Sequence, residues 1–149
     1  MARFVGQLDF APQDPGRPDE WKLEQDFGFV RDDGLMIIAQ AGEHTDGASI
    51  PRFLWRVLGH PFHKGNRFWA IPHDAGYHGC AVIIDLIAAQ ITPEYALDNW
   101  RTPVVDSFVH AADLDRKWWD ESLQMAMVAK GECAVKRKTV CAAVRMFGW

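Results

Sequence analysis

Asp33-Gly34 constrains the fold most, because this dipeptide lies between two apolar runs, residues 21–30 and 35–43. Asp-Gly is one of the preferred turns between two antiparallel strands. The sequence therefore predicts a β-hairpin over residues 21–41. Residues 3–10 alternate roughly between apolar and polar and are expected to add a third strand.

The pattern changes after residue 44, where segments with helical periodicity replace the strand-like runs. Ser49 is a suitable N-cap for a short helix, and Gly131 is a natural stop for a long one. Pro72 is expected to bend or to start the element that contains it. Residues 91–108 hold two prolines and are expected to form a connector with a helical turn. Four helical segments are predicted, over residues 52–58, 67–90, 109–131 and 133–149.

The order of these elements predicts an α+β protein. An N-terminal β-hairpin or small antiparallel sheet is expected to precede a helical body. Residues 1–149 are few enough to form a single domain, with a β-rich part over 1–44 and a helical part over 45–149.

Composition excludes several classes of protein. The net charge of −4 gives no electrostatic footprint for nucleic acid, so no nucleic-acid partner is expected. The N-terminus lacks an apolar core long enough for a signal peptide, and no apolar run approaches a membrane span. Cys80, Cys133 and Cys141 form no metal-binding pair and are expected to stay reduced.

His73 and Asp74 form the centre of the candidate site, because both side chains can carry charge, bind metal or move protons. On a continuous helix His73 and Tyr77 share a face, while Asp74 points about one hundred degrees away. Asp120 lies on the later long helix and can face His73 across an antiparallel pair. This set suffices to activate water, with a histidine base, one aspartate to orient it and another to hold a metal. A buried His–Asp pair with a purely structural role is the alternative.

Residues 45–51, TDGASIP, form a second motif with two interpretations. Thr45 and Asp46 can hydrogen-bond a turn, and Gly47 can supply a positive φ, which requires no chemical role. Asp46 can instead approach Asp74, where two carboxylates would share a cation or a proton. Asp74 and Asp46 are therefore the candidate metal ligands.

An HD-type metal phosphohydrolase is a further interpretation. The His73-Asp74 pair would then need one more histidine and one more aspartate as ligands of a divalent transition metal. The candidates for these two positions are His60 or His63, and Asp113, Asp115 or Asp120.

Four segments together resemble a phage-encoded family of unknown function. They are TDGASIPR, HDAGY, DESLQMAM and AAVRMFG, and the resemblance covers about residues 20–148. Members of that family share the T-D-G-A-S-I-P-R and H-D-x-x-Y motifs. The resemblance implies a protein of phage or prophage origin, located in the virion or in the host cytoplasm.

HDAGYHG, RKWWDESLQMAM and AAVRMFG are also distantly similar to the catalytic helices of bacterial secreted phospholipases A2. That similarity implies His73 as general base, Asp74 as Ca²⁺ ligand and Asp120 as the carboxylate that orients the histidine. Tyr77 would be a supporting hydrogen-bond donor. The chain departs from that family before the histidine, where Ala70-Ile71-Pro72 replaces a cysteine pair, and it lacks a recognisable glycine-rich calcium loop.

Three functions follow as hypotheses. The first is a virion- or tail-associated structural or accessory protein on a phospholipase-A2-like scaffold, with other phage structural proteins as partners. The second is a Ca²⁺-dependent lipid esterase that acts on a lipid surface during phage entry or lysis. The third is a modulator of host defence that binds a protein or a small molecule.

Overall fold

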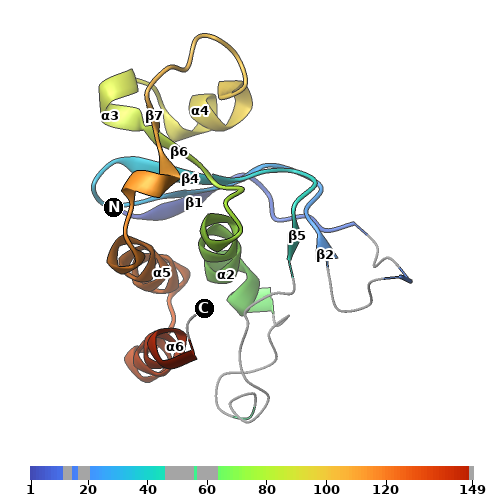
Figure 1. Cartoon of the computed structure of the whole chain (residues 1–149), viewed down its shortest axis with the longest axis vertical. Helices are drawn as coiled ribbons and strands as arrows, with labels where there is room; N and C mark the ends of the chain where they lie inside the picture. Colours follow the sequence, from blue (N-terminus) through green and yellow to red (C-terminus); the bar gives the residue numbers. More distant parts are fainter. Residues whose placement is uncertain (12–14, 17–20, 46–55, 57–63, 148–149) are drawn as a thin grey trace.

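The computed structural model describes residues 1–11, 15–16, 21–45, 56 and 64–147. An antiparallel sheet crosses the middle of the molecule, and helices cover both of its faces (Figure 1). A separate pair joins β2 (Trp21–Lys22) to β5 (His44–Thr45). The predicted α+β class is confirmed. The main sheet has the strand order β1 (Arg3–Val5), β3 (Phe27–Val30), β4 (Leu35–Ala39), β6 (Val82–Asp85) and β7 (Phe108–Val109).

The predicted hairpin is confirmed as β3 and β4, which pair antiparallel around the Asp33-Gly34 turn. Gly34 has a φ of +84°, a left-handed conformation that glycine adopts without strain. β1 pairs with β3 on the other side and is the predicted third strand.

The predicted helix over residues 67–90 is wrong in its second half. α2 (Lys64–Tyr77) ends before Gly79, which has a φ of +71°. The chain then enters β6, which pairs with β4 and β7 inside the sheet, and continues as the short helix α3 (Leu86–Ala89). Ile83 and Ile84 are β-branched and fully buried between these strands, an environment that favours extended backbone over helix.

Residues 91–108, predicted as a connector, contain a complete helix and the start of an edge strand. α4 (Pro93–Asn99) begins at Thr92, whose hydroxyl accepts a hydrogen bond from the backbone N–H of Tyr95. α3 and α4 lie on the upper face of the sheet in Figure 1. The sheet therefore takes two of its strands from the part of the chain after residue 45.

The two predicted C-terminal helices are confirmed as α5 (Arg116–Lys130) and α6 (Ala134–Phe147). α5 begins after Asp115, whose carboxylate caps its first turn, and ends at Gly131 as predicted. The residues just before it form a 3₁₀ turn, η2 (Ala111–Asp113), and not the start of the helix. α2, α5 and α6 lie below the sheet (Figure 1).

A buried arginine fixes α5 against the hairpin. Arg31 is 4% exposed and stacks on the Trp118 ring at 4.1 Å from its centroid. Its guanidinium donates to the Asp33 carboxylate, to the Trp118 carbonyl and to the Ser122 hydroxyl. This network sets the position of the helix that carries Asp120.

Some expectations fall outside the described residues. The predicted helix over 52–58 and its Ser49 cap are among these, apart from Arg56, which is helical.

Cys80, Cys133 and Cys141 are free thiols. Within the described ranges, no helix combines the length and the apolar character that a membrane crossing requires.

Candidate functional site

α2 and α5 pack as an antiparallel pair. Gly76 near the end of α2 faces the Trp119 ring near the start of α5, whereas Trp69 in the first half of α2 donates a hydrogen bond to Glu132 beyond the end of α5. A Cβ atom on Gly76 would lie only 2.3 Å from the Trp119 ring. Glycine at this position therefore permits the close approach of the two helices.

The close approach brings His73 and Asp120 together, as the sequence predicted. His73 Nε2 lies 4.0 Å from Asp120 Oδ1, and the two residues are 6% and 8% exposed. Neither atom has a hydrogen-bond partner among the described residues. Buried polar atoms are seldom left unpaired, so two that face each other about 1 Å beyond hydrogen-bond range indicate a pair that closes by a small side-chain movement.

Burial and neighbouring charges set the protonation of this pair. Burial and, to a smaller extent, the Arg116 cation lower the pKa of His73 to about 4. Burial raises the pKa of Asp120, while Arg116 and Arg145 oppose that shift. Arg145 Nε lies 3.9 Å from Asp120 Oδ2. At neutral pH the imidazole is therefore uncharged and able to accept a proton.

Arg116 connects this site to α6. Its Nη2 donates to the carbonyl of Val144 at 2.9 Å and to that of Arg145 at 3.3 Å. These carbonyls belong to the last turns of α6, where a cation is favourable. Arg116 thereby holds α6, with Arg145, beside Asp120.

Tyr77 contacts His73 through its ring. The two ring centroids lie 4.6 Å apart at an angle of 44°, and Tyr77 is 40% exposed. Burial and the Asp120 charge raise the pKa of Tyr77, while Arg116 opposes this shift. Tyr77 thus forms the outer wall of the site, between His73 and solvent.

Asp74 points to a different side of α2 from His73 and there meets the second motif. The Thr45 hydroxyl donates to Asp74 Oδ2 at 3.1 Å. Thr45 is the first residue of TDGASIP, so this bond joins the two motifs of the sequence. Asp46, the other predicted metal ligand, lies outside the described residues.

Glu43 is a site residue that the sequence did not predict. Its side chain is 9% exposed, and its Oε1 lies 3.8 Å from His78 Nδ1. Its Oε2 is buried and lacks a hydrogen-bond partner in the described part of the chain. Burial raises the pKa of Glu43 to about 7. Its spacing of two residues from Thr45 on an extended segment could have suggested that both side chains share a face.

The described residues contain no group of three or more His, Cys, Asp or Glu side chains arranged to hold a metal ion. The Asp74 carboxylate accepts a hydrogen bond from the Thr45 hydroxyl, and Thr45 lines a narrow cavity together with Glu43. Among the ligands required by the HD-type interpretation, His60 and His63 lie outside the described residues. Asp115 is engaged as the cap of α5.

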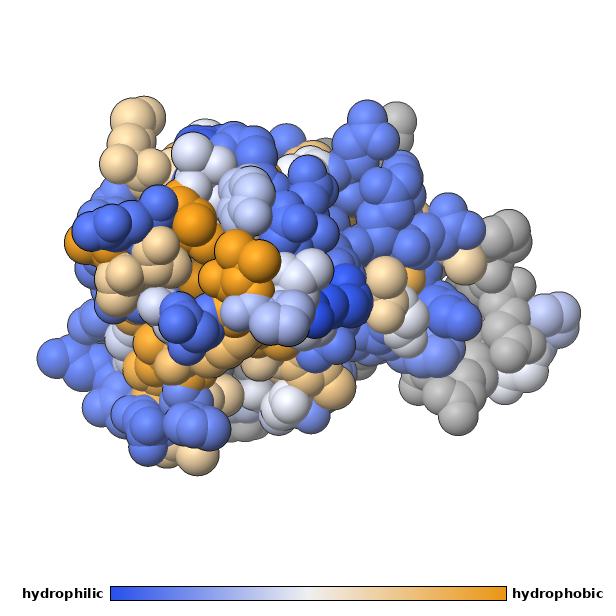
Figure 2. Space-filling model, turned by 90° about the horizontal axis from the view of Figure 1, so that it is seen from above, coloured by the Kyte–Doolittle hydropathy of each residue, from blue (hydrophilic) through white to orange (hydrophobic). Residues whose placement is uncertain are grey.

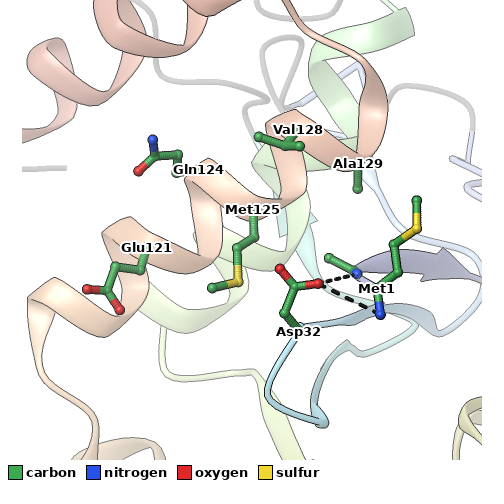
Figure 3. A pocket seen from close by; sticks show the side chains of 8 residues that line it. Met1, Asp32, Glu121, Gln124, Met125, Val128 and Ala129 are labelled. Atoms are coloured by element: carbon green, nitrogen blue, oxygen red, sulfur yellow. Dashed lines mark hydrogen bonds and ion pairs between the residues drawn. The ribbon is translucent and has the colours of Figure 1, made fainter.

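A separate cavity of about 460 Å³ lies on another side of α5 (Figure 3). Asp32 forms one wall, with its carboxylate bonded to the Ala2 backbone N–H. The α5 residues Glu121, Met125 and Val128 form the opposite wall. His73 and Asp120 do not line this cavity, so it is distinct from the histidine site.

The chain belongs to the DUF1353 family, which is described as proteins of unknown function, and the family model matches residues 21–144. This agrees with the expectation of a family of unknown function that covers nearly the whole chain. The matched region contains Glu43, His73, Asp74 and Asp120, and it ends one residue before Arg145. No curated protein and no solved structure matches the chain.

Proposed function

We propose that this member of the DUF1353 family is a hydrolase of lipid esters that activates water at His73. The observation that carries the proposal is the buried, otherwise unpartnered pair of His73 Nε2 and Asp120 Oδ1 at 4.0 Å. A general base needs an unprotonated nitrogen and a partner that orients the ring, and this pair supplies both.

The reaction assigns a different task to each ring nitrogen. Nε2–H of His73 donates to Asp120, which leaves Nδ1 to accept the proton of the attacking water. Asp120 then stabilises the imidazolium that forms, and the same proton passes to the leaving alkoxide. Arg145 beside Asp120 favours the ionised carboxylate that this step requires.

The similarity to phospholipases implies Ca²⁺, and Asp74 is the described residue that would hold it. The unpartnered buried oxygen of Glu43, next to Thr45, fits such an ion, because hard divalent cations prefer carboxylate and hydroxyl oxygens. Bound there, Ca²⁺ would supply a Lewis acid at the C-terminal end of α2.

A lipid is favoured as substrate by the exposed side chains beside the site. Tyr77 covers His73 and is 40% exposed, and Met146 follows Arg145 on α6 and is 73% exposed. Aromatic and apolar side chains next to arginine suit the boundary between lipid tails and anionic headgroups. A phage hydrolase of this kind would act in entry or lysis.

A role as a virion- or tail-associated structural protein is the second candidate, and another surface favours it. Hydrophobic side chains gather on the face formed by α3, α4 and β7 (Figure 2). Ile87, Val104 and Phe108 come from these segments and their connection and are 71%, 65% and 45% exposed. Contiguous exposed apolar surface is typical of protein interfaces, such as one with other phage structural proteins. A host-defence modulator has no such support within the described residues.

An ester hydrolysis assay tests the proposed activity. Phosphatidylcholine vesicles and a soluble short-chain ester are incubated with the protein in Ca²⁺ and in chelator. We expect fatty acid release from the vesicles in Ca²⁺ and little release in chelator. Absence of release from both substrates in Ca²⁺ would contradict the proposed function.

A further inference from the structure

We propose that Glu43 and Asp74, with the Thr45 hydroxyl between them, bind a hard divalent cation. The inference rests on the proposed function, for which it adds a second carboxylate ligand beyond Asp74. It assigns a role to a residue that neither motif contains.

The proposed site lies where the C-terminal end of α2 meets the extended segment that contains Glu43 and Thr45. Asp74 lies in the last turn of α2 and His78 lies one residue beyond it, where the His78 backbone N–H donates to the Asp74 carbonyl at 2.9 Å and continues the helical turn. Glu43 and Thr45 are two residues apart on the extended segment that ends in β5, so they share a side. Thr45 meets Asp74 at 3.1 Å, and Glu43 meets His78 at 3.8 Å. Both carboxylates therefore lie at one crossing of helix and strand.

Glu43 provides an observation that does not depend on this arrangement. Its side chain is nine-tenths buried, and its Oε2 has no hydrogen-bond partner in the described ranges. The same side chain lines a narrow cavity with Leu23, Thr45 and Ile71. An unpartnered carboxylate oxygen in such a place is costly, and a bound cation would remove that cost.

The chemistry of the cavity selects the class of ligand. It has no room for a water-sized sphere, which favours a bare ion over an organic amine. Its polar donors are oxygens, which favours Ca²⁺ or Mg²⁺ over transition metals. Ca²⁺ is preferred because it tolerates irregular geometry, with backbone carbonyls as its remaining ligands. With only two carboxylates, the dissociation constant is expected to be on the order of 10⁻⁴ to 10⁻³ M.

Thermal unfolding with and without about 10 mM Ca²⁺ tests the site, at a concentration about 10 to 100 times the expected dissociation constant. We expect Ca²⁺ to raise the Tm of the parent by about 3 to 11 °C. Glu43→Gln and Asp74→Asn are each expected to lose that shift. Glu24→Gln is the matched control, because Glu24 is a nearby acid that is exposed, and it is expected to keep the shift.

Terbium luminescence provides a second readout that does not depend on stability. Trp21 is the cross-strand neighbour of Thr45 and should sensitise Tb³⁺ bound at this crossing. Ca²⁺ is expected to displace the signal, and Glu43→Gln to lack it. A parent without a Ca²⁺-dependent Tm shift, or a Glu43→Gln variant with the full shift, would overturn the cation site.

The failure of the site and the failure of the hydrolase are distinguishable. His73→Gln is expected to lose hydrolysis and keep the Ca²⁺ shift, because His73 faces α5 and not Glu43. A protein that binds Ca²⁺ through Glu43 but hydrolyses no ester would retain the cation site and refute the proposed activity.

Discussion

His73→Gln is expected to lower the rate of ester hydrolysis by about two to four orders of magnitude, the usual contribution of a general base. Asp120→Asn is expected to cost about 10- to 100-fold, because the amide can still hold the ring but cannot stabilise an imidazolium. The double variant is expected to be no slower than His73→Gln alone, since residues that act as a unit are strongly non-additive.

A suitable control for this series is His110→Gln, because His110 is exposed and lies just before η2, away from the helix pair. It is expected to hydrolyse esters at the parental rate. Independent, additive losses in the His73 and Asp120 variants would show that the two residues do not work as a pair.

Gly76→Ala is expected to lower the free energy of unfolding by about 1 to 3 kcal/mol, the range for overpacking a core. The added Cβ would lie 2.3 to 2.5 Å from three atoms of the Trp119 ring, which is rigid and only 6% exposed. The helices must therefore separate. Because His73 and Asp120 span the same contact, hydrolysis is expected to fall as well. Denaturant unfolding and the ester assay measure the two effects.

Gly28→Ala is the matched control for crowding. A Cβ on Gly28 would also lie 2.3 Å from a neighbour, but that neighbour is the terminal methyl of Met36, which can move aside. Its expected cost is smaller than that of Gly76→Ala. A second substitution, Trp119→Leu, is expected to restore part of the stability lost by Gly76→Ala. Equal effects of the two alanine substitutions would argue against a tight α2–α5 contact.

Local sequence signals predicted the hairpin and the C-terminal helices because residues within these segments mark where a turn lies or where a helix ends. Gly34 marks the turn, and Gly131 has a φ of +85° at the end of α5. The break between α2 and β6 was missed because a short buried apolar run reads the same as helix or strand by periodicity. Long-range pairing with β4 decides that the run is a strand.

The candidate site also has a part that the sequence predicted and a part that it did not. The sequence suggested that His73 can face Asp120, because the two residues lie on helices that could pack as an antiparallel pair. Glu43 could not be predicted, because its significance depends on burial against Leu23 and Ile71 and on a helix that follows it by more than twenty residues. Burial of a carboxylate is a property of the tertiary structure and leaves no local pattern.

The pH dependence of kcat/KM for ester hydrolysis, at saturating Ca²⁺, tests most directly whether buried His73 is the base. A base acts only when unprotonated, so the rate falls as the pH drops through its pKa. Because the pKa of His73 is lowered to about 4, we predict a rate that is constant from neutral pH down to about pH 5 and falls near pH 4. A fall in kcat/KM near pH 6.5, the pKa typical of an exposed histidine, would contradict the assignment of buried His73 as the base.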